Sequence, residues 1–300
     1  MTRQIIEDPS LTVVLGRQRA GKTHRTAEEI KADLLANPKT GKLPRKTLVV
    51  DNNNEYSWLR HLNPTPANIT RFVKQEAVEA RRIVLVNSTG LPLSLKEKMD
   101  IVRMTVQYFR NGHLVYDDID KYATHTSEQD IISMLMGVTH IGCDVTTIHQ
   151  SWRKMSVTEV ENKRTIRLHA TEDSPDSLPP EKKAAMSMEI SQIAQIIVKE
   201  HFDMANRDHR EKKLTDLQYL QAKSYFLYID YIMGVIYPIH NEETKTWALR
   251  KYLMTNKNLI NDELTTMLFE GKITESGKKN PDNIETAIQR QILKYEHYFN

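Results

Sequence analysis

Residues 16–23 constrain the fold of this chain more than any other stretch of its sequence. They read Gly-Arg-Gln-Arg-Ala-Gly-Lys-Thr and match the pattern G-x-x-x-x-G-K-[ST] at every position. A β-branched run at 11–15 predicts a buried strand before them, and a helix is predicted from 21 to 36. A glycine-rich loop between a strand and a helix is the context in which this pattern cradles phosphate, so a chance match is the poorer explanation.

The residue types in this loop suit phosphate binding. Gly16 and Gly21 lack side chains, so main-chain N–H groups can turn toward phosphate oxygens. Lys22 would reach the β- and γ-phosphates, and the Thr23 hydroxyl would ligate magnesium. We therefore predict that ATP with Mg²⁺ binds here and is hydrolysed. The predicted nucleotide-binding residues are Gly16, Arg17, Gln18, Arg19, Ala20, Gly21, Lys22, Thr23 and His24.

The chain up to about residue 170 alternates short apolar runs with helical segments. Further strands are predicted at 46–51, 82–86, 113–117, 144–148 and 165–169. Helices are predicted at 68–80, 95–109 and 130–138. Strands separated by helices of this length form βαβ units, which make parallel sheets. The predicted fold class is therefore α/β, with a mostly parallel central sheet flanked by helices.

The pattern changes after residue 180. A long helix with an apolar stripe is predicted at 181–200, and the stripe is expected to face the core. The Tyr- and Ile-rich segment 225–239 predicts strand, compatible with a hairpin. Later residues predict helices, the last of which begins at Pro281. We expect a P-loop ATPase domain at 1–240 and a small helical C-terminal appendage at 241–300.

Two aspartates end the strand predicted at 113–117. Parallel sheets bind ligands at the carboxyl ends of their strands, where Asp117 is expected to hold magnesium, directly or through water. Asp118 is expected to polarise the attacking water, although many ATPases carry the longer glutamate there, which leaves its role as a base open. Asp120 is a weaker candidate for these roles. The structural alternative, a strand closed by turn-forming aspartates, is disfavoured by the phosphate loop.

A polar pair also follows the strand predicted at 144–148. A side chain at this strand end is expected beside the γ-phosphate, where it can orient water or sense cleavage. Gln150 is the first candidate and His149 the second, because a lone histidine at a strand end is more often structural.

Together these segments resemble the FtsK–HerA superfamily of P-loop ATPases, motors that move DNA. The resemblance rests on residues 16–23, 51–56, 116–118 and 148–150. The segment 51–56, Asp-Asn-Asn-Asn-Glu-Tyr, is the most telling, because HerA-like proteins and viral packaging ATPases often carry an aspartate, a few polar residues and Glu-Tyr or Glu-Trp after the second strand. The resemblance spans about 11–168, and Asp118 departs from the commoner glutamate.

The resemblance implies the RecA-like (ASCE) form of the P-loop NTPase fold and a homo-oligomeric ring, often a hexamer. Such rings hold nucleotide between subunits and DNA in a central channel, and an arginine from the neighbouring subunit completes each site. Arg164 is ranked first for this role, ahead of Arg167 and Arg153.

The implied function is ATP-driven DNA translocation, most consistent with a viral genome-packaging motor. The implied partners are double-stranded DNA, bound without sequence preference, and a capsid portal or vertex. A HerA-like or conjugation-type DNA pump and a helicase-associated ATPase stay open. So do two other classes, a small-molecule kinase and an assembly or secretion factor similar to zonula-occludens-toxin-like proteins.

Composition bounds the setting. No apolar run approaches the ~20 residues that span a bilayer, and the first residues lack the apolar core of a secretory signal. A lone cysteine, Cys143, fits a reducing compartment. The expected location is the cytoplasm, that of a host cell if the protein is viral. The net charge of +3 does not decide the nucleic-acid question, and the basic clusters at 42–46 and 209–213 could be phosphate contacts or solvated surface.

Overall fold

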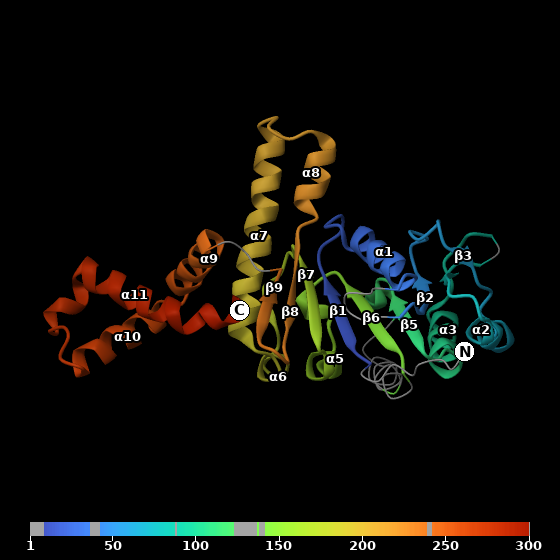
Figure 1. Ribbon diagram of the computed structural model, residues 1–300, viewed down its shortest axis with the longest axis horizontal. Coiled ribbons are helices and arrows are strands. Elements are labelled where there is room, and N and C mark those ends of the chain that lie inside the picture. Colours follow the sequence, from blue (N-terminus) through green and yellow to red (C-terminus); the bar gives the residue numbers. More distant parts are fainter. Residues whose placement is uncertain are drawn as a thin grey trace.

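The computed structural model describes residues 9–36, 43–87, 89–122, 137, 142–238 and 242–299. In this part of the chain nine strands form one sheet, in the order β3-β4-β2-β5-β6-β1-β7-β8-β9 (Figure 1). Every pairing from β3 across to β7 is parallel, and β8 and β9 add antiparallel strands at one edge. The predicted α/β fold with a mostly parallel sheet is confirmed.

The strands agree closely with their prediction. Those at 11–15, 46–51 and 165–169 have the predicted bounds, and the 225–239 segment forms the antiparallel pair β8–β9. The two-residue β3 was not predicted, because both of its side chains are exposed and leave no apolar pattern. The strands are β1 (Leu11–Leu15), β2 (Lys46–Asp51), β3 (Arg60–His61), β4 (Ala80–Val84), β5 (Gly112–Tyr116), β6 (Asp144–His149), β7 (Thr165–His169), β8 (Phe226–Asp230) and β9 (Val235–Tyr237).

The helices differ more from their prediction. The helix predicted at 181–200 is two helices, α6 and a longer α7, and its apolar stripe faces the core as expected. The helix predicted at 130–138 lies outside the described residues except for Gly137. The helices are α1 (Lys22–Asp33), α2 (Pro66–Lys74), α3 (Leu95–Tyr108), α5 (Val157–Asn162), α6 (Pro180–Ala184), α7 (Met188–Arg210), α8 (Asp216–Lys223), α9 (Glu242–Thr255), α10 (Lys257–Phe269) and α11 (Pro281–Tyr295), and the short 3-10 turns include η1 (Ile119–Lys121), η2 (Trp152–Lys154) and η5 (Glu296–Phe299).

Both faces of the central strand β1 are buried. Consecutive strand residues point to opposite faces, so Val13 and Leu15 join the larger apolar cluster whereas Val14 joins the smaller one. The smaller cluster also contains Ile30 of α1 and Tyr56. This double burial holds the carboxyl end of β1, and with it the phosphate loop, in a fixed position.

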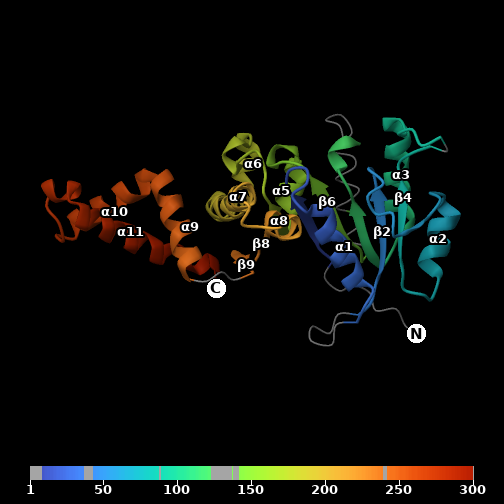
Figure 2. The ribbon, with the colours of Figure 1, turned by 90° about the horizontal axis from the view of Figure 1, so that it is seen from above.

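Helices α9, α10 and α11 extend to one side of the sheet (Figures 1 and 2). Helix α9 packs against α7, and η5 packs against β9. Lys251 of α9 pairs with Glu200 of α7 at 3.0 Å, and the Tyr298 hydroxyl donates to Glu189 at 2.8 Å. The C-terminal helices are therefore attached to the sheet both through α7 and directly through β9. None of the helices in the described ranges is long and apolar enough to cross a membrane.

Helices α7 and α8 form an arm that rises beyond the sheet (Figure 1). Strand β8 starts opposite His169, which ends β7. Because β7 runs parallel to β1, the arm leaves the sheet at the edge where the phosphate loop begins.

Candidate nucleotide site

The loop 16–23 joins β1 to α1, as its pattern predicts, and both of its glycines are required by their surroundings. A Cβ on Gly16 would lie 2.7 Å from the Cβ of His169 on β7. Gly21 has a φ of 85°, a conformation that L side chains rarely adopt, and a Cβ there would overlap Ser224. The loop thus keeps its main chain close to its neighbours, with no room for side chains at these two positions.

Lys22 is buried at the start of α1. Its ammonium donates to the carbonyl oxygens of Gly16 and Arg17, the latter at 2.9 Å. Burial lowers the pKa of Lys22, and the carboxylates of Asp118 and Asp117 offset part of that effect. The ammonium is thus held beside the loop and faces the acids at the ends of neighbouring strands.

A cavity of about 450 Å³ lies between the loop and these strand ends. Strand β6 separates β1 from β5, so the cavity spans the ends of three neighbouring strands. Predicted residues from separate parts of the sequence line it together, namely Gln18, Arg19, Gly21, Lys22, Thr23, Asp117, Asp118 and Gln150. His24 is exposed on α1 and is not among the lining residues.

Asp117 and Asp118 follow β5 and have different environments. Asp117 is 2% exposed, and its burial, reinforced by Asp118 and Glu55, raises its pKa well above the usual range. Burial also acts to raise the pKa of Asp118, but hydrogen bonds from Asn53 and Lys121 outweigh it and the pKa is lowered. Asp118 is therefore the ionised member of the pair, and Asp117 is the one that a cation would help to ionise.

Three donors meet at one oxygen of Asp118. Asn53 Nδ2, Lys121 Nζ and Gln150 Nε2 lie 2.7, 2.9 and 3.3 Å from Oδ2. Asp118 also has a φ of 46°, which aspartate tolerates better than most residues. A carboxylate held in this way is a weak base, so it is better suited to orienting water than to removing a proton.

The site fits a magnesium ion shared with phosphate. The Thr23 hydroxyl and the Asp117 carboxylate supply hard oxygen donors to the cavity, and Mg²⁺ is commonly held by one or two protein ligands plus substrate phosphates. The crowding of Asp117 by other carboxylates is what a cation would relieve. Among the residues that the structure describes, no group of three or more His, Cys, Asp or Glu side chains is arranged to hold a metal.

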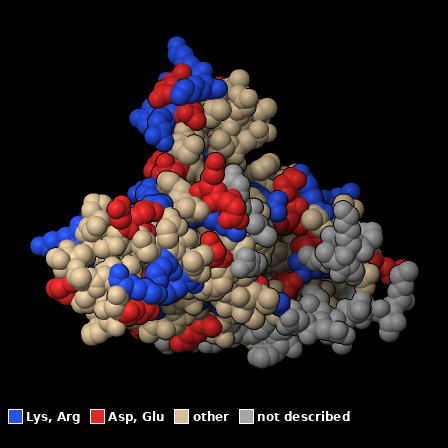
Figure 3. All heavy atoms as spheres, turned by 60° about the vertical axis from the view of Figure 1, so that its left-hand side comes forward, with Lys and Arg blue, Asp and Glu red and all other residues tan. Residues whose placement is uncertain are grey.

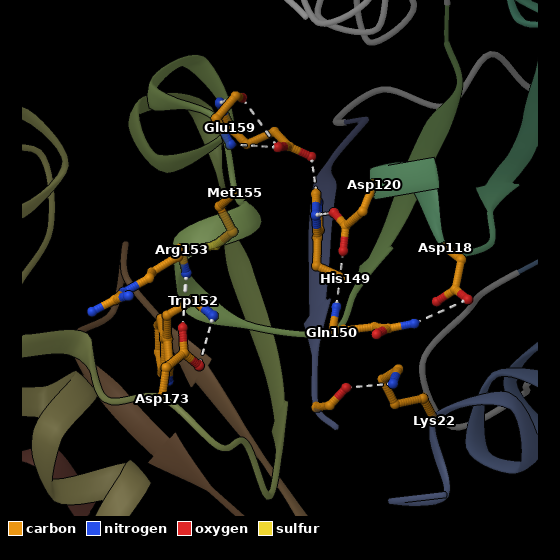
Figure 4. A network of polar contacts seen from close by, with 12 residues as sticks. Lys22, Asp118, Asp120, His149, Gln150, Trp152, Arg153, Met155, Glu159 and Asp173 are labelled. Atoms are coloured by element: carbon orange, nitrogen blue, oxygen red, sulfur yellow. Dashed lines mark hydrogen bonds and ion pairs between the residues drawn. The ribbon is translucent and has the colours of Figure 1, made fainter. Parts of the chain in front are cut away.

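Gln150 and His149 point to different places (Figure 4). The Gln150 side chain faces the cavity and donates to Asp118. His149 is buried away from it, with Nδ1 2.6 Å from Asp120 and Nε2 2.9 Å from Glu159. Asp120 also accepts the main-chain N–H of Gln150 at 3.2 Å. These contacts are those of a structural histidine. Asp120 joins His149 to the main chain of Gln150, the residue that faces the cavity.

Burial alone would lower the pKa of His149, but Glu159 and Asp120 raise it to about 10. Burial would likewise raise the pKa of Glu159, whereas the imidazolium lowers it to about 2. Removing one partner of a buried ion pair costs about 3–5 kcal/mol. We therefore expect His149→Gln to lower the free energy of unfolding by about this amount near pH 6, measured by urea unfolding.

The pH dependence tests the charge of this cluster. A raised histidine pKa stabilises the fold fully below 6.5, and this contribution is lost as the pH rises through about 10. The lowered pKa of Glu159 stabilises above 4.5 and is lost toward about 2. The loss of unfolding free energy caused by His149→Gln should therefore be largest between pH 4.5 and 6.5 and smaller at pH 10. The double variant His149→Gln/Glu159→Gln should recover part of it, and a penalty that does not change with pH would contradict a charged His149.

The candidate arginines lie apart. Arg164 precedes β7, its main-chain N–H donating to Leu11 at the amino end of β1, so it lies at the edge opposite the loop. Arg167 is fully buried and binds Glu29 and Thr26 of α1. Arg153 is exposed in η2, just after Gln150, and the carboxylate of Asp173 accepts its main-chain N–H at 3.0 Å (Figure 4).

Three residues at the site were not predicted from the sequence. Glu55 accepts a 2.5 Å hydrogen bond from the Thr23 hydroxyl, and Lys121 donates to Asn53 at 2.7 Å as well as to Asp118. Asn53 and Glu55 belong to the segment 51–56, whose position after β2 could have indicated them. Nothing local indicated Lys121, which reaches the site through η1.

The aspartate that opens the segment 51–56 has a structural task. Asp51 is fully buried and accepts the main-chain N–H groups of Glu55 and Tyr56 at 2.9 and 3.0 Å. Arg82 of β4 balances its charge at 2.9 Å. Asp51 therefore folds the turn that carries Asn53 and Glu55 to the cavity.

No family model and no curated protein match the chain. Among solved structures it is similar to the genome packaging NTPase B204 from Sulfolobus turreted icosahedral virus 2 in complex with AMP, at 17% identity and a TM-score of 0.44, with 78% of this chain and 98% of that chain covered. It is similar to B204, the DNA-packaging ATPase from Sulfolobus turreted icosahedral virus, at 19% identity and a TM-score of 0.42, covering 78% and 100%.

The N-terminal domain of zonular occludens toxin from Neisseria meningitidis is a more distant neighbour. It has 10% identity and a TM-score of 0.31, and the match covers 55% of this chain and 78% of that one.

Proposed function

We propose that this chain is a magnesium-dependent ATPase that works as a ring-shaped DNA translocase, with viral genome packaging as its setting. One observation carries the ATPase assignment. Lys22, Asp117, Asp118 and Gln150 come from three strand ends and line a single cavity beside a glycine loop. Separate strand ends that converge on a phosphate loop supply the parts that phosphoryl transfer needs.

Each residue has a proposed task. The loop N–H groups and Lys22 hold the phosphates, and Thr23 and Asp117 hold Mg²⁺, which neutralises phosphate charge when bound. Asp118, held by its three donors, orients the attacking water together with Gln150. The chemistry is thus mainly positioning and charge stabilisation.

The motor assignment predicts a response to DNA. We expect random-sequence duplex DNA to raise the steady-state rate of ATP hydrolysis severalfold, because a translocase couples ATP turnover to movement along DNA. The measurement is phosphate release with and without duplex, at low and high salt, since phosphate contacts weaken steeply with salt. A rate that is indifferent to DNA of any kind would leave an ATPase but argue against a translocase.

We further propose that Arg153 is the arginine that acts on the neighbouring subunit's nucleotide, in place of Arg164. Arg153 is exposed at the loop edge of the sheet, whereas Arg164 precedes β7 at the opposite edge and Arg167 is occupied by α1. The division into an ATPase domain at 1–240 and an appendage at 241–300 also stays a proposal. Limited proteolysis near residue 241 tests this division. Native mass spectrometry tests the proposed ring and measures its size.

A further inference from the structure

The arm formed by α7 and α8, residues 199–224, has a basic tip and a root that touches the phosphate loop. We propose that the tip binds the phosphate backbone of duplex DNA, and that the root couples this binding to the nucleotide. This inference rests on the proposed function, since it supplies the DNA contact that a translocase needs.

The arm is held together by its own side chains. The rings of His209 on α7 and Tyr219 on α8 stack with centroids 4.1 Å apart, and the Tyr219 hydroxyl donates to Asn206 at 2.9 Å. Gln218 and Thr215 form a capping box at the start of α8. The two helices can therefore act as one rigid unit that projects from the sheet.

The tip carries four cations among the carboxylates of Asp208, Glu211 and Asp216. Arg207, Arg210, Lys212 and Lys213 occur within seven residues, and Figure 3 shows Lys and Arg side chains gathered at the end of the arm with acidic ones among and below them. Lys213 pairs with Glu211 at 2.6 Å. Arg210 and Lys212 are exposed and make no ion pair with any residue in the described ranges.

A hollow of about 590 Å³ on the arm is lined by Arg207, Arg210 and His209 near the tip and by Glu200 and Asp203 nearer the root. Glu200 and Asp203 would repel phosphate from the root, so the contact falls to the two tip cations that make no ion pair within the described part of the chain. Exposed cations that make no ion pair with the described residues, as here Arg210 and Lys212, are the groups that displace counterions from DNA.

The root of the arm touches the phosphate loop from both helices. Ser224, directly after α8, lies against Gly21 so closely that a Cβ on the glycine would overlap it. Phe202 of α7 lies under the guanidinium of Arg17, 5.3 Å from the ring centre. A shift of the loop on phosphate binding would therefore move the base of the arm. The factor by which bound nucleotide then changes the affinity for DNA must equal the factor by which bound DNA changes the affinity for nucleotide.

The test of the tip is Arg210→Ala/Lys212→Ala, assayed by anisotropy of a labelled random-sequence duplex over a salt series with a non-hydrolysable ATP analogue. We expect the slope of log affinity against log salt to fall by about two, one unit per lost phosphate contact. DNA stimulation of hydrolysis should be lost and the basal rate kept. The matched control Lys257→Ala/Lys279→Ala removes the same charge from exposed sites on the C-terminal helices and should change neither value.

The test of the root is Phe202→Ala. Wild-type protein should bind duplex with different affinities in the presence of the analogue and of ADP, and this ratio should approach one in the variant while the salt slope stays unchanged. A wild-type protein that does not bind DNA overturns the translocase and the arm together. If DNA stimulates ATP hydrolysis by the wild-type protein but the tip variant keeps the wild-type salt slope, the proposed role of the arm is wrong and the translocase stands. The same holds if the tip variant loses its oligomers and keeps DNA binding, since the arm would then be a contact between subunits.

Discussion

Lys22→Ala is expected to abolish ATP hydrolysis, with the rate constant falling by about 10³-fold or more, the scale at which enzymes lose a preorganised charge that stabilises the transition state. Lys22 is buried at the loop, and its ammonium is already aligned by the carbonyl oxygens of Gly16 and Arg17. No other Lys or Arg in the described ranges makes these contacts, so water would fill the space left by the side chain.

The matched control for this variant is Lys31→Ala. Lys31 lies on the same helix but is exposed, and it pairs with Glu28 at 2.9 Å, a contact of small energetic value. Its removal should leave hydrolysis within about twofold of wild type. Both variants should melt close to the wild-type temperature. Substantial hydrolysis by a well-folded Lys22→Ala protein would refute the assignment of the loop.

Arg153→Ala is expected to lower the rate constant by about 10³-fold while the monomer keeps its stability, because an arginine supplied across a subunit interface acts on the transition state alone. The Arg153 side chain is exposed, so its truncation removes little buried contact. Asp173 holds the main chain of η2 and not the guanidinium, so the turn should keep its shape.

A mixing experiment separates action in trans from action within one subunit. Lys22→Ala and Arg153→Ala are each expected to be inactive, but mixed rings contain interfaces where an intact loop meets an intact Arg153. Hydrolysis should therefore reappear on mixing, as measured by phosphate release after subunit exchange. Arg164→Ala is the comparison. If it abolishes hydrolysis and complements Lys22→Ala while Arg153→Ala remains active, the role belongs to Arg164.

His149 and Gln150 show how two neighbouring residues can have different roles. His149 and Gln150 are consecutive, so the alternation of a strand directs their side chains apart. The sequence ranks Gln150 ahead of His149 as the residue beside the phosphate, but it does not indicate where either side chain points. Only the positions of Asp120 and Glu159 decide that the histidine becomes a buried cation and the glutamine the group that faces the cavity.

By itself the sequence determined the phosphate loop, the strands on which the site is built and the α/β class, because each depends on local properties. Glycines at 16 and 21, β-branched runs and helical spacing are visible within a few residues. The tertiary structure decided the rest: that Asn53 and Lys121 hold Asp118, that Arg153 and Arg164 lie at opposite edges, and that Ser224 closes on Gly21. The contacts of Asn53 with Asp118 and of Ser224 with Gly21 join residues that are far apart in the chain, so they depend on strand order and register, which no local pattern encodes. Lys121 lies only three residues from Asp118, and the turn η1 brings the two side chains together.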